Sequence, residues 1–513
     1  MELVDCDYAM LKAMVETLDI WFWALALSIL FTVQPFVNSG GAQLRFVRWL
    51  AVIFAAAALM VSVTFIESLP GTMVATVSSW HLLSVYRFIK RRHNDQELTR
   101  RVRTTTLWLM PLMLIGTYVY VYEQNLLSNT SIEYTQVFIV SLSLAIGLLV
   151  ALTTLWNLLT RRIKRSPVIS DQQKPTVTLA IPARNETHAL SAAIERAVAS
   201  DYPKLEILVL DDCSQDKTSD IIKKFAHDGV RFVQGIEPSS SWLGKNRAYR
   251  ILSEEASGEV IIFSGVDVHF QEASISRLIE YMLNNKLSMV SVMPRRRGVN
   301  FWANFLQPLR YLSQIALPLD MFGRQPVLSS CWAVDRQSLK GLRGFTPIKG
   351  EIVPEQHFAR IFAHQHRYEF VIGDKWLGIS TQKKLSSQIE TATRTLYPRI
   401  RQEMALLLAV VLFSLLVFVL PYLVVMDWLL SDYPADSLVN TSLIAIGLFS
   451  LANLSISLKN QPKLSALSLI SLPFIVVSYA VTAIWSSIKY EFGTVNWKGR
   501  NVCLPVLEQK RAR

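Results

Sequence analysis

Residues 176–212 read TVTLAIPARNETHALSAAIERAVASDYPKLEILVLDD, and this stretch decides the fold class of the central part of the chain. Two short apolar runs rich in β-branched residues, 176–183 and 205–212, enclose a more polar segment. Each run is almost continuously apolar, which is typical of strands in a parallel sheet with both faces covered. The stretch therefore predicts a strand, a helix and a second, parallel strand.

The alternation of apolar runs and polar helical segments continues from about residue 166 to about residue 400. VRFVQG (230–235) and EVIIFSG (259–265) are the next expected strands. Such a βαβ series predicts a doubly wound α/β domain. Ligands of such domains bind at the carboxyl ends of the strands, so the polar residues of those turns are the candidate site residues.

The rest of the chain is apolar enough to lie in a membrane. Hydrophobic residues make up 51% of the 513 residues, more than is usual for a soluble protein. A helix that spans a bilayer needs about 20 apolar residues. Such stretches lie before the α/β region at 20–38, 48–66, 70–87, 104–122 and 136–160, and after it at 404–430, 438–458 and 464–488.

We therefore expect three regions in the chain. An N-terminal transmembrane region of about five helices covers residues 1–160, the α/β domain covers 161–403, and a C-terminal transmembrane region of about three helices with a basic tail covers 404–513. Basic loops mark the cytosolic side. RFIKRRHNDQELTRRVR (87–103) and RRIKR (161–165) are basic, whereas EQNLLSNTSIEYT (123–135) has no Lys or Arg.

This charge pattern places the α/β domain in the cytosol of a multi-pass protein of a bacterial-type inner or plasma membrane. Three C-terminal spans would then leave the basic tail outside, unless one apolar stretch is re-entrant or interfacial, so the number of spans stays open. The net charge of +12 comes from Lys and Arg beside apolar stretches, where anionic lipids account for it, and no nucleic-acid partner is expected. The four cysteines are far apart, so neither a zinc site nor a disulfide framework is expected.

Polar residues suited to nucleotide binding follow the first two expected strands. Glu186 follows the first strand where a helix begins, and the helix N-terminus favours an anionic phosphate. Asp211 and Asp212 end the second strand, where carboxylates hydrogen-bond to a ribose or a base. Helix capping alone is the alternative, but two adjacent acids exceed what a cap needs.

Two later turns carry a cation and a candidate metal ligand. In WLGKN (242–246) the glycine allows close backbone approach and Lys245 supplies a positive charge for a diphosphate. In FSGVDVH (263–269), Asp267 is placed to ligate a divalent cation, Mg²⁺ or Mn²⁺, and His269 is a possible second ligand. A lone Asp in such a turn is otherwise a turn former.

Seven motifs occur in a fixed order: PARNE (182–186), DDCSQDKT (211–218), WLGKN (242–246), EVIIFSGVD (259–267), VSVMP (290–294), NFWANFLQP (300–308) and WKGR (497–500). Together they resemble the family 2 glycosyltransferases with a GT-A domain, a nucleotide-diphospho-sugar transferase fold. The nearest likeness is to the membrane-bound subgroup that includes hopanoid-associated, carotenoid-type and ceramide glycosyltransferases, and it covers about residues 176–500.

The resemblance implies roles for the candidate residues. Glu186, Asp211 and Asp212 would bind the nucleoside, Lys245 the diphosphate side and Asp267 the metal. The family's Asp-x-Asp is Gly-Val-Asp here, so its first carboxylate is missing at Gly265. Either Asp267 suffices with substrate oxygens and water, or it pairs with His269, or metal binding is impaired; we favour the first.

The general base is expected in EIVPEQHFAR (351–360), where the resemblance implies an acidic pair before a helix. Glu355 would remove the proton of the acceptor hydroxyl as that hydroxyl attacks the anomeric carbon. The preceding acid of the family is Pro354 here, and Glu351 and His357 are nearby substitutes. The alternative is that Glu355 only stabilises a helix N-terminus.

Three further segments are expected near the membrane or the substrate. Residues 301–312 have apolar positions at helical spacing, as in an interfacial helix or a buried core helix. Arg399 and Arg401, directly before a span, are expected to contact phosphate. Trp497 and Arg500 complete the candidate substrate-binding set.

The expected function is an inverting transfer of a sugar from a nucleotide-diphospho-sugar to a lipid or lipid-linked acceptor. A single transfer is favoured because the processive Gln-x-x-Arg-Trp element is absent. A catalytically weakened nucleotide-sugar-binding scaffold is the alternative, motivated by Gly265 and Pro354. A transporter with a regulatory nucleotide domain is less consistent with the few ionisable residues in the expected spans, mainly Asp427 and His81.

Overall fold

The computed structural model describes residues 129–503 except 240, 298–300, 307, 320–323, 401, 432–433, 435 and 461. The chain divides into two compact units, Met1–Val137 and Phe138–Arg513, and the second contains nearly all the described residues. The expected spans at 20–38, 48–66, 70–87 and 104–122 lie outside the described residues.

A seven-stranded sheet forms the centre of the α/β domain, in the order β3-β2-β1-β4-β8-β6-β9. β8 is antiparallel to β4 and β6, and the other neighbours are parallel. The strands are β1 (Val177–Ala183), β2 (Leu205–Asp211), β3 (Val230–Gln234), β4 (Val260–Ser264), β6 (Met289–Met293), β8 (Cys331–Asp335) and β9 (Tyr368–Ile372). The four strands expected from the sequence are β1 to β4.

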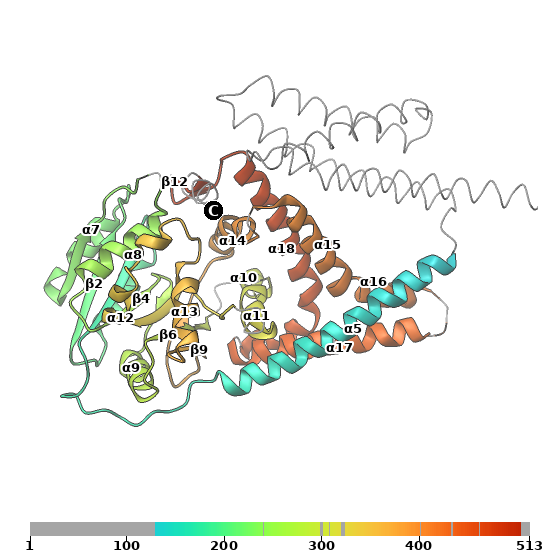
Figure 1. Ribbon diagram of the computed structural model, residues 1–513, viewed down its shortest axis with the longest axis horizontal. Coiled ribbons are helices and arrows are strands. Elements are labelled where there is room, and N and C mark those ends of the chain that lie inside the picture. Colours follow the sequence, from blue (N-terminus) through green and yellow to red (C-terminus); the bar gives the residue numbers. More distant parts are fainter. Residues whose placement is uncertain are drawn as a thin grey trace, which may run out of the picture. The chain divides into compact units, whose positions relative to one another are not determined.

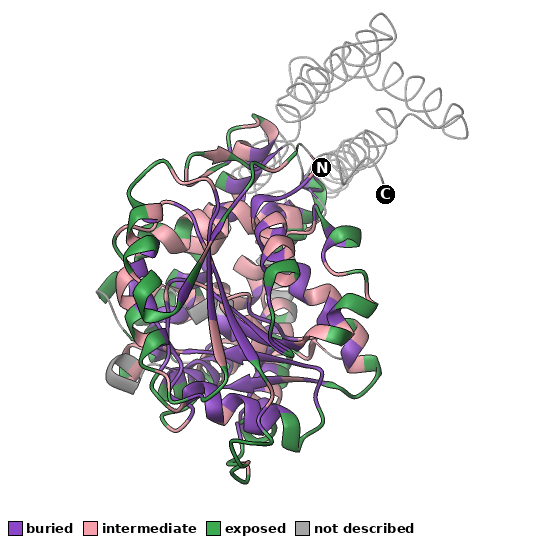
Figure 2. Cartoon of the chain, turned by 90° about the vertical axis from the view of Figure 1, so that its left-hand side faces the viewer, coloured by how far each residue is buried: buried purple, intermediate pink, exposed green. Residues whose placement is uncertain are grey.

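Helices cover both faces of this sheet, as Figures 1 and 2 show. Alternate residues of β1 enter two separate cores: Leu179 packs with helices α6, α7 and α9, and Ala180 packs with α8, α12 and α13. The doubly wound prediction is confirmed. These helices are α6 (Leu190–Val198), α7 (Thr218–Lys224), α8 (Gly244–Glu255), α9 (Ser274–Asn284), α12 (Arg336–Gly341) and α13 (Pro354–His364), with short 3-10 turns η2 (Ala226–Asp228) and η4 (Thr346–Ile348).

Local sequence explains where the helices nearest the site begin. The Asp335 side chain accepts a hydrogen bond from Ser338 N at 2.7 Å and caps α12. α13 begins at Pro354, which is tolerated in the first turn because the missing N–H has no partner there. Glu355 therefore stands in the first turn of α13, at a fixed position beside α8.

Two small sheets lie beside the main one. β5 (Val268–His269), β10 (Ser380–Thr381) and β7 (Arg295–Arg296) form one, in the order β5-β10-β7. β11 (Asn496–Trp497) and β12 (Arg500–Asn501) form an antiparallel hairpin near the C-terminus. We call residues 496–501 the C-terminal hairpin.

Three helices among the described residues are long and apolar enough to cross a membrane: Ile139–Thr160, Ser437–Asn460 and Ser465–Glu491. They match the spans expected at 136–160, 438–458 and 464–488. They belong to α5 (Asn129–Thr160), α17 (Ser437–Asn460), and η5 (Pro462–Leu467) with α18 (Ser468–Glu491). These helices lie on one side of the sheet domain (Figure 1).

The stretch expected as one span at 404–430 consists of two helices. α15 (Met404–Phe418) and α16 (Leu420–Leu430) meet at Val419, and Pro421 in the first turn of α16 has no N–H to continue α15. Neither helix is long enough to span a bilayer alone. α14 (Leu385–Arg399) and α15 are bent by 116° and count as a fourth candidate only if taken together.

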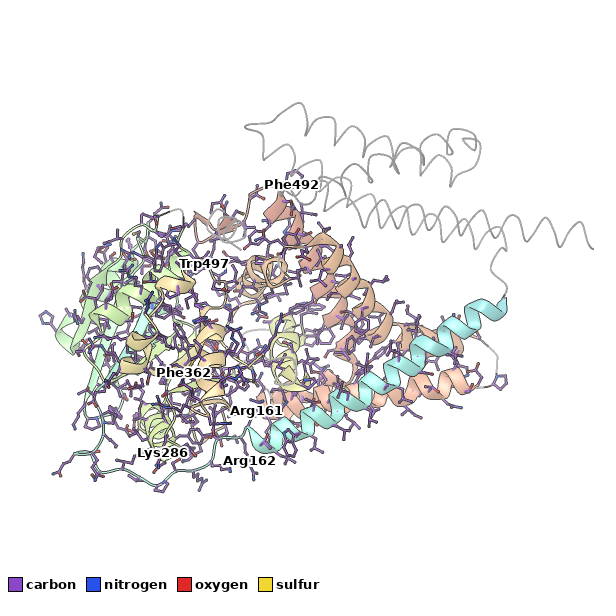
Figure 3. The ribbon with its side chains drawn as sticks, viewed as in Figure 1. Arg161, Arg162, Lys286, Phe362, Phe492 and Trp497 are labelled. Atoms are coloured by element: carbon purple, nitrogen blue, oxygen red, sulfur yellow. The ribbon has the colours of Figure 1, made fainter. Side chains whose placement is uncertain are left out.

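The amphipathic segment expected at 301–312 forms parts of two helices: the first has the features of an interfacial helix and the second those of a buried core helix. In α10 (Phe301–Phe305), Phe301 and Trp302 are 47% and 58% exposed, as suits a membrane interface. In α11 (Pro308–Ala316), the apolar side chains are buried in the same core as α17 and α18. Arg161, labelled in Figure 3, directly follows α5. Its carbonyl accepts a hydrogen bond of 2.8 Å from the main-chain N–H of Ile372 in β9, which links the end of α5 to the sheet.

Candidate active site

The acids that end β2 lie at the carboxyl edge of the sheet and are both buried. Asp211 shapes the turn: one carboxylate oxygen accepts from Ser214 N at 3.1 Å and the other from Ser219 Oγ. Asp212 instead faces the C-terminal hairpin. Of the two acids, Asp212 is therefore the one whose side chain reaches the C-terminal hairpin, whereas Asp211 binds the turn and the start of α7.

The C-terminal hairpin contacts the candidate nucleoside residues through two ion pairs. Arg500 binds Asp212 with both guanidinium nitrogens, at 2.7 and 3.2 Å, and Lys498 Nζ pairs with Glu186. Arg500 Nη2 also pairs with Glu237 at 2.9 Å. Two acids expected to hold a nucleoside thus have cationic partners within the chain.

Gly244 makes room for this contact. A Cβ atom at this position would overlap Arg500 Nη1 and would lie 3.2 Å from Asp212 Oδ2. The sequence analysis explained this glycine by close approach to a ligand. The close approach in the structure is instead to the Arg500 side chain, so three motifs distant in the sequence meet at one point.

Arg184 is a site residue that the sequence analysis missed. Its side chain is 4% exposed and donates to three main-chain carbonyls, those of Asp212, Cys213 and Lys498, the last two at 2.9 and 3.1 Å. It therefore fixes the turn after β2 to the C-terminal hairpin. Its place inside the PARNE motif, directly after the apolar strand and before Asn185 and Glu186, was the available signal.

Lys245 and the expected base Glu355 form an ion pair. Glu355 is fully buried, and its second oxygen, Oε2, has no hydrogen-bond partner among residues 129–503 as far as the structure describes them. Asn246 Nδ2 donates to the carbonyls of Ile348, Lys349 and Glu351 at 2.8 to 3.1 Å and holds the loop before α13 against α8. The two helices thus present a lysine and a carboxylate to each other.

Asp267 lies after β4 and is only partly buried. Its Oδ2 has one weak contact, with Thr381 Oγ1 at 3.4 Å, and a Cβ at Gly265 would lie 2.6 Å from its Oδ1. Burial raises the pKa of Glu186, and the positive charge of Lys498 partly offsets this rise. The negative charge of Asp267 raises the pKa of Glu186 further, so Glu186 and Asp267 lie within electrostatic range of each other. The structure brings Asp267 to the edge that carries Glu186 and Asp212.

His269 has different surroundings from Asp267. It is 7% exposed and lines a pocket on the α6 and α9 side of the domain. Burial, together with the charge of Arg196, lowers its pKa to about 4, although Asp267 opposes this shift. The described residues contain no group of three or more His, Cys, Asp or Glu that could hold a metal ion.

The remaining expected residues are placed as follows. Trp497 belongs to the C-terminal hairpin (Figure 3). The guanidinium carbon of Arg394, a residue of α14, lies 4.7 Å from the centre of the Trp497 ring. Arg399 is exposed in the last turn of α14, and Arg401 lies outside the described residues. His357 is half-buried on α13, and burial lowers its pKa, with Arg360 adding to the effect.

The buried Asp212 gives a pH prediction. Burial raises its pKa to about 6, although Arg500 and Arg184 oppose the rise. Its contribution to stability is therefore fully present below about pH 4 and is lost as the pH rises through 6, the reverse of an ordinary paired carboxylate. Asp212→Asn removes the titration but also one partner of Arg500, so the change to look for is relative: the melting temperature of the variant should rise against that of wild type as the pH increases from about 3 to about 7.

The largest gain expected for Asp212→Asn over this range is about 3 kcal/mol. Thermal unfolding of both chains in the same detergent, followed by circular dichroism at several pH values, measures the difference. A difference that does not change with pH would show that Asp212 does not titrate near 6.

Comparison with known proteins gives the class of the domain. Residues 178–343 match the family model described as Glycosyl transferase family 2. Together with the sheet order and the strand-end carboxylates, this makes the α/β region a family 2 glycosyltransferase domain with the GT-A fold. The narrower likeness to the hopanoid-associated, carotenoid-type and ceramide subgroup stays a prediction.

The chain is 29% identical over 119 residues to the probable glycosyltransferase YdaM of Bacillus subtilis, covering 22% of this chain and 28% of that one. It is 29% identical over 111 residues to the UDP-Glc:alpha-D-GlcNAc-diphosphoundecaprenol beta-1,3-glucosyltransferase WfaP of Escherichia coli, covering 22% and 43%. The matches thus span less than half of these relatives.

Among solved structures, the mannosyltransferase PcManGT of Pyrobaculum calidifontis, in complex with GDP-Man and Mn²⁺, is similar at 16% identity and a TM-score of 0.42. That match covers 69% of this chain and 99% of the other.

Proposed function

We propose that the chain transfers one sugar from a nucleotide-diphospho-sugar to a hydroxyl of a lipid or lipid-linked acceptor, with inversion at the anomeric carbon. The proposal is supported by Glu186 and Asp212, which pair with Lys498 and Arg500 of one hairpin, and by Asp267, whose charge acts on Glu186, at the carboxyl edge of a GT-A sheet. Lys245 follows Gly244, which lies against Asp212, and pairs with Glu355. Ligands of doubly wound sheets bind at this edge.

The proposed donor site lies under the C-terminal hairpin. Asp211, Asp212 and Glu186 supply acceptors for a ribose and a base, and Arg500 and Lys498 supply positive charge for the diphosphate. Because both cations already pair with acids, donor binding must exchange these pairs for contacts with the nucleotide. The hairpin therefore has to shift when the donor enters.

A divalent cation fits beside Asp267. Its carboxylate is partly exposed and has only the 3.4 Å contact with Thr381, so its oxygens are available to a hard cation. Since the described residues hold no group of three or more His, Cys, Asp or Glu that could bind a metal, diphosphate oxygens and water would complete the ligand set. The cation would offset the charge of the leaving diphosphate.

Glu355 is the proposed general base. In the reaction the acceptor oxygen attacks the anomeric carbon, the bond from that carbon to the β-phosphate oxygen breaks, and Glu355 takes the hydroxyl proton. The ion pair with Lys245 supports a link between donor and base. A bound diphosphate would be a second anion beside Lys245. Its negative charge would weaken the ion pair between Lys245 and Glu355.

A lipid acceptor is supported by the packing of the domain on apolar helices. One hydrophobic core contains Phe263 of the sheet together with Val150 of α5, Val417 of α15 and Phe449 of α17. The exposed aromatic residues of α10 lie beside α14 and α18. We propose a multi-pass membrane protein whose domain, residues 161–403, faces the cytosol and meets the acceptor at the bilayer surface.

The second candidate is a nucleotide-sugar-binding protein with little turnover. Gly265 and Pro354 replace two acids of the family pattern, and Glu355 is fully buried against Lys245. This candidate predicts donor binding without release of nucleoside diphosphate.

Nucleoside diphosphate release by the detergent-purified full chain distinguishes the two. UDP- and GDP-sugars are supplied with and without extracted membrane lipids, and the lipids are then examined by mass spectrometry. We expect release, and a lipid heavier by one hexose-type unit, only when donor and lipid are both present. Binding of a donor by calorimetry with no release over the whole panel would favour the second candidate.

A further inference from the structure

A basic pocket of about 500 Å³ lies apart from the proposed donor site. Its wall comes from the end of α6, the chain from β5 to α9, and β10. The charged residues in its wall are Arg196, Arg277, Arg297 and Glu272, so positive charge exceeds negative by two if His269 is neutral. None of the eight residues proposed above for the donor, the metal or the base lines it.

The three arginines have no acidic partner within the described residues. Arg277 donates to the carbonyl of Trp376 and stacks on its ring, and neither Arg196 nor Arg297 forms a salt bridge there. Guanidinium groups in one concave site usually pair with carboxylate or phosphate. Three of them, none paired with a carboxylate of the described residues, point to an anion from outside the chain.

Buried polar atoms without partners give a second, independent observation. Arg196 Nη1, His269 Nδ1 and Ser380 Oγ are buried and have no hydrogen-bond partner in the part of the chain that the structure describes, and all three residues line the pocket. His269 and Ser380 are only 7% and 6% exposed, and they are paired across β5 and β10. Buried polar groups are nearly always satisfied, and an unmet group commonly marks an ion or ligand site.

The pocket also faces the N-terminal end of α9. Gln271, Glu272 and Ala273, which precede this helix, are part of the wall. The N-terminus of a helix of this length carries a partial positive charge and exposed N–H groups, both of which favour an anion. The three arginines, the N-terminal end of α9 and the Ser380 hydroxyl thus all favour an anionic ligand.

We propose that this pocket binds a phosphate-bearing ligand at a site separate from the donor site. The volume exceeds that of a bare phosphate and lies within the usual range for small organic ligands, so a phosphorylated molecule or an anionic lipid headgroup fits. Two of the wall residues, His269 and Ser380, adjoin the segments that hold Asp267. Occupancy is therefore expected to influence the position of Asp267.

The test uses the full chain in detergent and measures binding without any sugar donor. The variant Arg196→Gln/Arg297→Gln removes two charges from the pocket, and Arg196→Lys/Arg297→Lys keeps them. The control Lys224→Gln/Lys340→Gln removes two exposed charges outside the pocket. Inorganic phosphate, compared with chloride at equal ionic strength, is the soluble probe, and phosphatidylglycerol, compared with phosphatidylcholine, is the lipid probe.

We expect the pocket variant to lose at least two-thirds of one probe's effect, while the control keeps it and the lysine variant keeps part of it. Loss of the phosphate-dependent rise in melting temperature identifies a soluble phosphate compound. Loss of phosphatidylglycerol retention in native mass spectrometry identifies a lipid headgroup. Equal responses of the pocket variant and the control to both probes would overturn the proposal. Neither readout depends on glycosyl transfer.

Discussion

Glu355→Gln is expected to lower kcat for sugar transfer by about 10²- to 10⁴-fold, the range that a positioned general base contributes. Glutamine keeps the size of the side chain and an oxygen that accepts from Lys245, but it cannot take up a proton. The Oε2 atom has no partner within the described residues, so its replacement by an amide breaks no hydrogen bond. We measure nucleoside diphosphate release at saturating donor and lipid.

The ion pair with Lys245 requires a control for stability. Removing one member of a buried pair leaves the other uncompensated and destabilises the fold. The double variant Lys245→Gln/Glu355→Gln restores neutrality, so activity that returns in it would identify a structural role for Glu355. Because Lys245→Gln alone also removes a cation from the donor site, the base is supported if the double variant is less active than Lys245→Gln at an equal melting temperature.

Two nearby groups test the identity of the base. Glu351 precedes α13, and His357 follows Glu355 on the same helix. If Glu351→Gln or His357→Gln lowers kcat more than Glu355→Gln does, the assignment of Glu355 is wrong. Glu254→Gln on the exposed side of α8 serves as the matched control, because Glu254 pairs only with Arg250 four residues earlier.

The fold was predictable from local pattern because each strand of a covered parallel sheet must be apolar on both faces. β1 and β2 illustrate this, since all seven residues of β1 except Pro182 are buried. The antiparallel strand β8 was not predicted, because an apolar run carries no information about the direction of its neighbour. The break at Val419 was also missed, although Pro421 was a visible signal for it.

The candidate site was predictable only in part. Asp211, Asp212 and Asp267 were predicted as site residues because they follow strands, and the carboxyl ends of parallel strands meet at one edge of the sheet. The pairing of Asp212 with Arg500 joins residues 288 positions apart, and no spacing rule reaches that far. For the same reason the sequence indicated neither the ion pair of Lys245 with Glu355 nor the burial of His269 among arginines.

Asp267→Asn is expected to reduce transfer by about 10²- to 10⁴-fold, since loss of the metal would forfeit several kcal/mol of charge stabilisation in the transition state. The substitution keeps the shape of the side chain and its weak contact with Thr381, so the fold should be retained. Initial rates are measured over a range of Mn²⁺ and Mg²⁺ concentrations. We expect the apparent metal affinity to fall together with the rate.

Gly265→Ala provides a graded companion to this variant. The added Cβ would lie 2.6 Å from Asp267 Oδ1, closer than carbon and oxygen tolerate, so the carboxylate must turn away. The charge remains but its position changes, and a smaller loss than for Asp267→Asn is expected. The same contact explains why an acid is not accommodated at this position without a different placement of Asp267.

His269→Gln decides which ligand set the metal has. If Asp267 acts with diphosphate oxygens and water, this variant leaves the apparent Mn²⁺ affinity unchanged, because His269 lines the arginine-rich pocket. If Asp267 and His269 bind the metal as a pair, both variants weaken that affinity to a similar degree. A wild-type rate that does not depend on divalent cations contradicts the metal altogether. Lys245, Lys498 and Arg500 would then be the cations that offset the charge of the diphosphate.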